Sequence, residues 1–301
     1  MRAAMLIAVT LVCPDPAATD ALARHVAEAV AKLAGPVKRT TTLGPGAIDL
    51  VIEHDQVSPV RLAARDALGE AAFDLCVQPW EGRRKRLLVA DMDSTIIGVE
   101  CLDELADFAG VKAEVSAITE RAMRGEIDFE GALTERVAML KGLPLDALER
   151  CYAERVRRNP GARTMVTTMA AHGARCVLVS GGFTFFTSRV AAAAGFHDQR
   201  ANTLIDDGQG LLTGQVGRPI LGREAKLVAL NAEAAGLGVT AAEALAIGDG
   251  ANDLAMITAA GLGVAYRAKP LVAAEADARI DHGDLTALLY FQGYAEAQFA
   301  R

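Results

Sequence analysis

Apolar runs with the length of β-strands alternate with segments of helical periodicity along the first part of the chain. The strand-like runs occupy residues 5–12, 37–43, 47–52 and 73–77. The helical segments begin at Asp15-Pro16 and at Ser58-Pro59, which are typical helix starts, and Gly35-Pro36 stops the first of them. The resulting order, βαββαβ, predicts a ferredoxin-like split unit.

The pattern changes at residue 87, where short and continuously apolar runs begin. These runs cover residues 87–90, 176–179, 244–247 and 263–265. Such runs are typical of strands buried on both faces of a parallel sheet, and their alternation with helical stretches predicts a doubly wound α/β core. Residues 100–158 contain no strand-like run, so we expect an inserted helical cap there. The predicted division is an α+β unit at 1–82, a core at 83–98 and 159–301, and a cap at 99–158.

Composition narrows the class of function. The chain has 301 residues, with 31 Lys and Arg against 38 Asp and Glu, so its net charge is −7. This balance argues against non-specific nucleic-acid binding, which needs a basic surface. No apolar run approaches the roughly 20 residues that span a bilayer, so no membrane partner is expected. The basic residues at 83–86 are interpreted as a solvated linker.

Two features bear on the compartment. The five cysteines are scattered without a CxxC pair, which favours neither a zinc site nor a disulfide framework and fits a reducing compartment. The apolar opening resembles a signal peptide, but Pro14-Asp15-Pro16 follows it at once, so we interpret it as a buried strand. We therefore expect a cytoplasmic protein.

Polar residues follow three of the four core runs. The sequence DMDST stands at 91–95, SGG at 180–182 and GDGAND at 248–253, while Lys226 lies in a helical segment after Gly222. Ligands of doubly wound sheets bind beyond the carboxyl ends of the strands. We therefore expect four carboxylates, a lysine and a small hydroxyl to meet at one rim of the sheet.

Such a rim predicts phosphoryl transfer. Carboxylates gathered at one point need a cation, and hard oxygen ligands select Mg²⁺, here from Asp91, Asp249 and the backbone carbonyl of Asp93. Asp91 is placed to form an aspartyl-phosphate, and Asp93 to act as general acid and base. Lys226 and Ser180 would hold the transferring group. Each motif alone is weak, since DMDST could be a turn and Lys226 a surface lysine; their combination is what carries the prediction.

The order of these motifs resembles the haloacid dehalogenase superfamily of phosphatases and, within it, the phosphoserine phosphatase family, over residues 87 to about 289. The cap sequences VECLDELADFAG and ITERAMRGEIDFEGALTERVAMLKGLP carry the closer resemblance. The resemblance implies that Asp91 is the nucleophile and Asp93 the acid/base, that Asp91, Asp93 and Asp249 hold Mg²⁺, and that Asp253 supports Lys226. It implies substrate contacts at Glu100, Met123, Phe129, Arg136, Ser180, Gly181, Lys226 and Asn252.

The cap residues agree with this substrate class. Phosphoserine carries an ammonium that Glu100 could pair with and a carboxylate that suits the planar fork of Arg136. Met123 and Phe129 flank Gly125 and could close an apolar lid. Without the surrounding pattern, Glu100 would be interpreted as a helix N-terminal acid and Arg136 as an exposed arm that pairs with Glu135 or another neighbour.

The expected function is hydrolysis of O-phospho-L-serine, the last step of serine biosynthesis. The alternative is a related phosphatase or phosphotransferase acting on another small phosphate monoester. A phospho-aspartate signalling switch or an amino-acid sensor would be the non-enzymatic alternative. The first unit resembles an ACT domain, which implies amino-acid binding or a homodimer, although a packing or dimerisation module without a ligand would explain it equally well.

Overall fold

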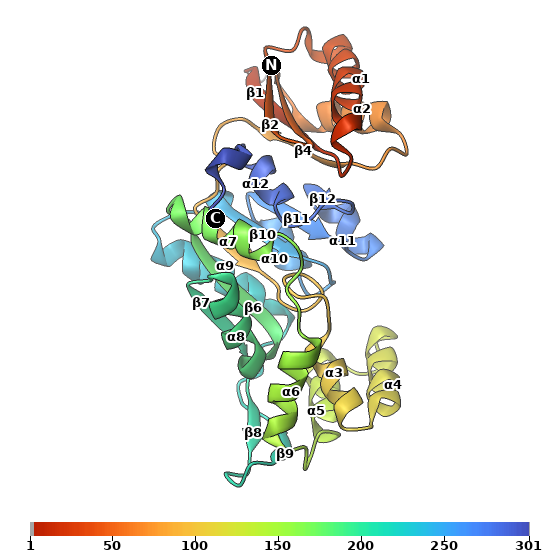
Figure 1. Ribbon diagram of the computed structural model, residues 1–301, viewed down its shortest axis with the longest axis vertical. Coiled ribbons are helices and arrows are strands. Elements are labelled where there is room, and N and C mark those ends of the chain that lie inside the picture. The colour runs from red at the N-terminus through yellow and green to blue at the C-terminus, as the bar shows by residue number, and fades with distance from the viewer. Residues whose placement is uncertain (1–2, 301) are drawn as a thin grey trace.

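The computed structural model describes residues 3–300 and, among them, every side chain except that of Met123. Three parts follow one another along the long axis of the molecule (Figure 1): a small N-terminal unit, a central sheet with its helices, and a helical cap beside a β-hairpin. The fold is α/β with an additional α+β unit, as the sequence predicts.

The N-terminal unit is a four-stranded antiparallel sheet covered by two helices. It comprises β1 (Met5–Val12), α1 (Pro16–Ala34), β2 (Arg39–Gly44), β3 (Ala47–His54), α2 (Val57–Leu68) and β4 (Asp74–Pro79). The strand order β2-β3-β1-β4 confirms the ferredoxin-like prediction. Alternate residues of β1, namely Ile7, Val9 and Leu11, pack with the helices, because successive strand side chains point to opposite faces.

The central sheet has six parallel strands in the order β12-β11-β10-β5-β6-β7. They are β5 (Leu87–Ala90), β6 (Arg175–Phe183), β7 (Asp198–Asn202), β10 (Ala244–Gly248), β11 (Leu262–Tyr266) and β12 (Ala278–Ile280). The associated helices are α7 (Ala162–Ala171), α8 (Thr184–Ala194), α9 (Arg223–Gly236), α10 (Leu254–Ala259), α11 (Pro270–Glu275) and α12 (Ala287–Phe291), with short 3₁₀ turns at Ala241–Glu243 and Glu296–Gln298. The neighbouring side chains of Leu87 and Leu88 in β5 point to opposite faces of the sheet. They belong to two different buried hydrophobic clusters, so both faces of the sheet are buried.

The two edge strands of this sheet, β7 and β12, are absent from the sequence prediction. The sequence of β7 is DQRAN and that of β12 is only three residues long. An edge strand has a neighbour on one side only and needs no continuous apolar run, so the pattern that reveals a central strand is missing.

The cap contains four helices inserted between β5 and β6: α3 (Cys101–Phe108), α4 (Lys112–Met123), α5 (Phe129–Ala138) and α6 (Leu145–Arg155). A hairpin from the core, formed by β8 (Leu204–Asp206) and β9 (Leu212–Val216), reaches this cap (Figure 1). The amide of Gly142 donates to the carbonyl of Leu212 at 2.8 Å, and the amide of Leu145 donates to the carbonyl of Gly210 at 2.9 Å. The cap is therefore joined to the core by this backbone pairing as well as by its connecting segments.

The prediction of a solvated linker at residues 83–86 is wrong. Arg83 and Lys85 are each only 8% exposed, while Arg84 and Arg86 face solvent. Arg83 Nη1 lies 2.7 Å from Asp49 Oδ2, and the amide of Lys85 donates to Gln292 Oε1 at 3.0 Å. The segment is extended between the N-terminal unit and the core, so alternate side chains turn inward and meet buried partners.

The second face of the N-terminal sheet lies on the core. Val12, Ala47 and Cys76 share a buried cluster with residues of α12. The Asp74 carboxylate accepts hydrogen bonds from three consecutive backbone amides, those of residues 281–283, at 2.7–3.1 Å. Both faces of this small sheet are thus used within the chain, one by its own helices and one by the core.

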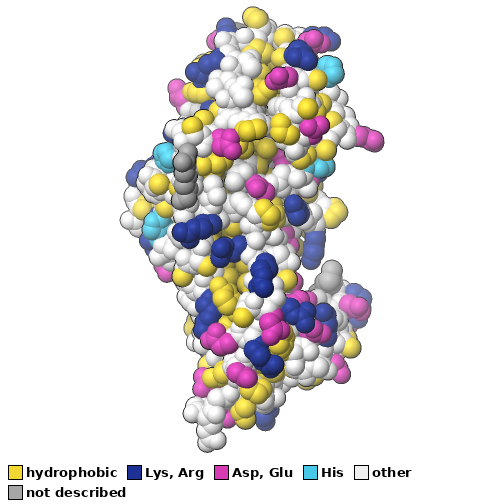
Figure 2. Space-filling model, in the orientation of Figure 1, with side chains coloured by type: hydrophobic (Ala, Val, Ile, Leu, Met, Phe, Trp, Pro, Cys, Tyr) yellow, Lys and Arg dark blue, Asp and Glu magenta, His cyan; other side chains and the backbone are white. Residues whose placement is uncertain are grey.

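The surface charge, the cysteines and the apolar composition of the helices bear on the class of protein. On the face shown in Figure 2, basic and acidic side chains are mixed over the cap. All five cysteines are free and buried. Among the described residues, no helix has both the length and the apolar composition needed to cross a membrane.

Candidate active site

The DMDST segment turns sharply as it leaves β5. The amide of Asp91 still donates to the carbonyl of Ile247 in β10, at 3.0 Å, which fixes Asp91 at the carboxyl end of the sheet. The amides of Thr95, Ile96 and Ile97 all lie within 3.3 Å of the Met92 carbonyl. Ser94 has φ +57°, a left-handed conformation that a residue with a side chain adopts only under constraint. This tight turn places both aspartates of the motif at the rim.

Lys226 is the buried cation of the site. It extends from α9, is 2% exposed, and its Nζ lies 2.5 Å from Asp91 Oδ1 and 2.5 Å from Asp253 Oδ1. Burial alone would lower the pKa of this amine, but the Asp253 and Asp91 carboxylates outweigh burial and raise its pKa above the ordinary value. The lysine is therefore charged and held between two carboxylates.

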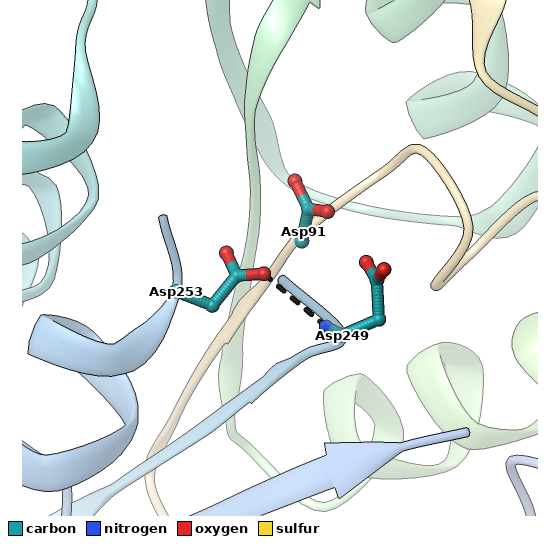
Figure 3. A group of neighbouring side chains, drawn as sticks. All are labelled: Asp91, Asp249 and Asp253. Carbon is teal, nitrogen blue, oxygen red and sulfur yellow. Dashed lines mark hydrogen bonds between the residues drawn. The ribbon is translucent and has the colours of Figure 1, made fainter. Parts of the chain in front are cut away.

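Asp253 holds this lysine and the loop around it. Its Oδ2 accepts from the amide of Asp249 at 3.2 Å (Figure 3). Its Oδ1 is bonded to Lys226, and its Oδ2 also accepts from the amide of Gly250 at 3.0 Å. A Cβ at Gly248 would lie 2.3 Å from Asp253 Cγ, so only glycine leaves room for this arrangement. Because both oxygens have close donors, Asp253 is suited to positioning rather than to binding an ion.

Asp91 and Asp249 fit a divalent cation. Single carboxylate oxygens of Asp91, Asp249 and Asp253 lie within 4.8 Å of one another, and the first two point toward a common space (Figure 3). Burial raises the pKa of Asp91 well above its usual range, and burial with the charges of Asp253 and Glu100 raises that of Asp249 to about 6. In both cases burial is the main cause and neighbouring carboxylate charge adds to it, and a hard divalent cation with oxygen ligands would offset this cost of holding the charged forms.

Asp93 lies on the other side of the turn, against the SGG segment. Its Oδ2 accepts from Ser180 Oγ at 3.1 Å, and its Oδ1 accepts from the amide of Cys101 at 3.0 Å. Ser180 Oγ in turn accepts from the amide of Gly182 at 2.8 Å. Burial, followed by the charge of Glu100, raises the pKa of Asp93 to about 6. A carboxyl with a raised pKa can hold a proton and give it up, which acid/base catalysis requires.

The sequence pattern places the SGG segment after the strand, but in the structure this segment is part of the strand. It belongs to the carboxyl end of β6, where the pairing with β7 shifts register between Val179 and Phe183. A Cβ at Gly182 would lie 2.8 Å from Asp93 Oδ2 and 3.0 Å from Ser180 Oγ. The irregular strand end thus brings the backbone against Asp93, and glycine permits that approach.

The cap contributes Phe129, Glu100 and Arg136. A Cβ at Gly181 would lie 3.2 Å from Phe129 Cζ, and one at Gly222 would lie 3.6 Å from Phe129 Cδ1. The ring of Phe129 therefore lies against two glycines of the core, and the cap is closed over the rim at this point. Glu100 Oε1 accepts from Ser94 Oγ at 2.7 Å, which ties the first cap helix to the turn after Asp93.

Considered without its surrounding pattern, Arg136 would be expected to pair with Glu135, but the structure shows no such pair. Glu135 pairs with Arg121, at 2.8 Å, whereas Arg136 Nε donates to the carbonyl of Ala132 at 3.2 Å. Burial lowers the pKa of Arg136, and the carboxylates of Asp103 and Glu100 oppose that effect. The Arg136 side chain is thus partly buried and close enough to Asp103 and to the exposed Glu100 to be influenced by their charges.

Two further predicted residues complete the comparison with the sequence. A Cβ at Gly250 would lie 2.3 Å from Asn252 Oδ1, so the Asn252 side chain folds over its own loop. Met123 ends α4, and its side chain lies outside what the structure describes. The remaining predicted residues reach the rim or its closure from β5, β6, α9, the loop after β10 and the cap.

Two residues with structural roles at the rim are absent from the sequence prediction. Thr95, the last residue of the DMDST motif, donates its Oγ1 hydrogen to Asp249 Oδ1 at 3.2 Å. Asn202 is buried; its Nδ2 donates to the carbonyl of Gly181 at 2.9 Å, and its Oδ1 accepts from the amide of Leu221 at 2.7 Å. Asn202 ends β7, and because that strand has no apolar pattern, nothing in the sequence marked its end.

Comparison with known proteins gives a consistent result. The model of the haloacid dehalogenase-like hydrolase family matches residues 88–258. A phosphoserine phosphatase from Polaromonas is 48% identical over 209 residues, which cover 68% of this chain and 88% of that protein.

Solved structures extend the similarity. The unliganded structure of a probable phosphoserine phosphatase from Vibrio cholerae has a TM-score of 0.77 at 30% identity and covers 97% of this chain and 88% of that one. A phospho-aspartyl intermediate analogue of phosphoserine phosphatase has a TM-score of 0.64 at 37% identity, covering 69% of this chain and 98% of that one. The chain belongs to the haloacid dehalogenase-like hydrolase family.

Proposed function

We propose that the protein hydrolyses O-phospho-L-serine to L-serine and phosphate through a phosphorylated Asp91. The observation that carries the proposal is the rim itself, where Lys226 bridges Asp91 and Asp253 beside Asp249. The three relatives named above, each matched over at least 88% of its own length, are phosphoserine phosphatases or probable ones. The phospho-aspartyl analogue in one of those structures supports the covalent route.

In the first step, the Asp91 oxygen that Lys226 does not hold attacks phosphorus. The bond between phosphorus and the serine oxygen breaks, and that oxygen takes a proton from Asp93. The raised pKa of Asp93 supports this role, because burial and the nearby Glu100 charge favour its protonated form. Lys226 balances the charge of the transferring group, and Ser180 Oγ can donate to one of its oxygens.

In the second step, a water oxygen attacks phosphorus and passes a proton to Asp93. The bond between phosphorus and Asp91 then breaks, which releases phosphate and restores both carboxyl groups. Asp91, Asp249 and the Asp93 carbonyl would hold Mg²⁺, which supplies charge neutralisation when bound.

The cap selects the substrate. Glu100 would pair with the ammonium of phosphoserine and Arg136 with its carboxylate, while Phe129 covers the phosphate region against Gly181. Met123 and Asn252 are proposed contacts on the strength of the family resemblance. This arrangement requires the ligand to present both an amino and a carboxylate group beside the ester, which sugar phosphates lack.

The test is phosphate release from O-phospho-L-serine, O-phospho-L-threonine and glucose 6-phosphate with Mg²⁺. We expect a strong preference for phosphoserine, and a loss of roughly 10- to 100-fold in kcat/KM for it in Arg136→Ala, since a charged hydrogen bond contributes about 1.5–3 kcal/mol. Arg121→Ala is the matched control, because Arg121 is a partly exposed arginine of α4 that pairs with Glu135. Equal turnover of all three esters would contradict the assignment.

Other parts of the interpretation are also proposals. The division at 1–82, 83–98 with 159–301, and 99–158 agrees with the positions of the two sheets and the cap. A cytoplasmic location is favoured by five free, buried thiols. Amino-acid binding by the first unit and a homodimer remain predictions.

A further inference from the structure

A cavity lies where the N-terminal unit meets the core. Its volume is about 650 Å³, within the range of small-molecule sites. It is lined from β2 and β3 by Arg39 and Asp49, from the extended segment after β4 by Trp80, Arg83 and Arg84, and from the C-terminal segment by Gly293. None of its lining residues belongs to the catalytic rim.

The walls of this cavity are positively charged. Three arginines line it against one aspartate, and that aspartate is fully engaged: Asp49 Oδ1 accepts from Thr10 at 2.6 Å and Oδ2 from Arg83 at 2.7 Å. Among residues 3–300, no carboxylate oxygen lies within 4.0 Å of a side-chain nitrogen of Arg39 or Arg84. Two positive charges on these walls are therefore not balanced by a direct ion pair in the described part of the chain.

The arginines are held by stacking, which leaves donors free. The guanidinium of Arg39 lies 4.2 Å from the Trp80 ring centroid and that of Arg83 lies 3.8 Å from it, while Arg84 lies 4.2 Å from the Tyr294 ring. Stacking uses the flat face of a guanidinium, so the N–H groups in its plane stay available for an anion. Arg84 Nη2 also donates to the Gly293 carbonyl and to Gln298 Oε1, each at 3.1 Å, which fixes its orientation and leaves its other N–H groups for an anion.

The floor of the cavity is closely packed. A Cβ at Gly293 would lie 2.1 Å from Arg83 Nη2, and Gly293 has φ +75°, so a side chain is excluded there by both space and conformation. Arg83 is consequently trapped between the N-terminal unit and the C-terminal segment. The cavity thus has a basic wall built from both units, in which Arg83 is buried and the exposed Arg39 and Arg84 side chains are oriented by their aromatic neighbours.

We propose that this cavity binds a small organic anion, with a carboxylate or phosphate group held by Arg39 and Arg84. Arg39 belongs to the N-terminal sheet and Arg84 to the segment leading into β5. A ligand bonded to both therefore ties the N-terminal unit to the core and stabilises their contact.

The test uses Trp80, the one tryptophan of the chain, as a local reporter. Malonate and sulfate are titrated separately into the metal-free protein at constant ionic strength, with chloride as the compensating salt. We expect a saturable change in tryptophan emission and a matching rise in Tm. Tighter binding of malonate would indicate a carboxylate ligand, and tighter binding of sulfate a phosphate ligand.

The variants separate this site from general salt effects. Arg39→Ala and Arg84→Ala are each expected to raise the half-saturating concentration at least tenfold, measured by calorimetry because Arg39→Ala also alters the surroundings of Trp80. Arg24→Ala is the control, since Arg24 is exposed on α1 and does not line the cavity. The proposal is overturned if neither anion saturates, or if both variants bind as the wild type does.

Discussion

Two buried assemblies of a cation with carboxylates can be compared in this molecule, one at the catalytic rim and one between the units. At the rim, Lys226 bonds to Asp91 Oδ1, and among the described residues no donor reaches the other oxygen of Asp91. Between the units, Arg83 bonds to Asp49, and both Asp49 oxygens have donors. The first assembly retains an oxygen that can react, and the second is complete.

This difference teaches how buried charge serves two purposes. A buried ion pair gains little net stability, because removing two charges from water costs several kcal/mol. Where all donors and acceptors are matched, as at Asp49, the pair fixes how two parts fit together. Where one carboxylate oxygen is left without a donor, as at Asp91, the same cost keeps an oxygen available for the proposed attack on phosphorus.

The largest effect is expected when the reactive oxygen is removed. Asp91→Asn should lower phosphoserine turnover by roughly 10³-fold or more, because an amide cannot form the phosphoryl intermediate. Steady-state phosphate release measures this, and the melting curve checks the fold. If Asp91→Asn kept near wild-type turnover of phosphoserine, the proposed covalent route would be excluded.

The closed assembly should respond in stability instead. Arg83→Ala leaves Asp49 buried without its cation and should lower the free energy of unfolding by about 3–5 kcal/mol. Denaturant titration measures this change. The control is Lys38→Ala, whose ion pair with Glu53 is about half exposed and should contribute less than about 1 kcal/mol. Equal losses in the two variants would show that the Asp49 pair does not fix the units.

The contrast also explains what could be predicted from the sequence. The rim was predictable because Asp91, Ser180 and Asp249 each follow an apolar run, and the ends of parallel strands converge. The Asp49–Arg83 pair was not, since Asp49 lies inside a strand of one unit and Arg83 in a basic stretch typical of solvated segments. Only tertiary packing brings them together. For the same reason, Asn202 went unnoticed at the end of a polar edge strand.

A smaller loss is expected when the backbone near Asp93 is crowded. Gly182→Ala would put a methyl group 2.8 Å from Asp93 Oδ2, which should displace this carboxyl and lower kcat by roughly 10²-fold. Gly222→Ala is the matched control, because its added methyl would meet Phe129 at an ordinary 3.6 Å. Similar kcat values in the two variants would argue against a positioned Asp93.

The smallest effect concerns the thiols. Burial raises the pKa of Cys76, at the contact between the units, to about 12, and that of Cys176 to about 12. The folded state then keeps protons that the unfolded state loses above its ordinary thiol pKa, so stability should fall gradually as pH rises beyond about 9. Denaturant midpoints measured from pH 8 to 10 test this, and a midpoint that rises over this range would contradict it.

Thiol labelling connects the two regions. At pH 8 the native protein should react only slowly with a disulfide reagent, because all five thiols are buried. Arg83→Ala should accelerate labelling of Cys76 more than labelling of Cys101, which lies beside Asp93 at the rim. Equal acceleration at both cysteines would mean that the variant unfolds globally instead of loosening the contact between the units.

The most direct measurement is chemical quenching during turnover of ³²P-labelled O-phospho-L-serine with Mg²⁺, followed by peptide mapping. A transient, hydroxylamine-sensitive label should appear on Asp91, decay as phosphate is released, and be absent in Asp91→Asn and after chelation of the metal. Phosphate release without a label on Asp91, or a label that forms on another residue at the rate of turnover, would contradict the account.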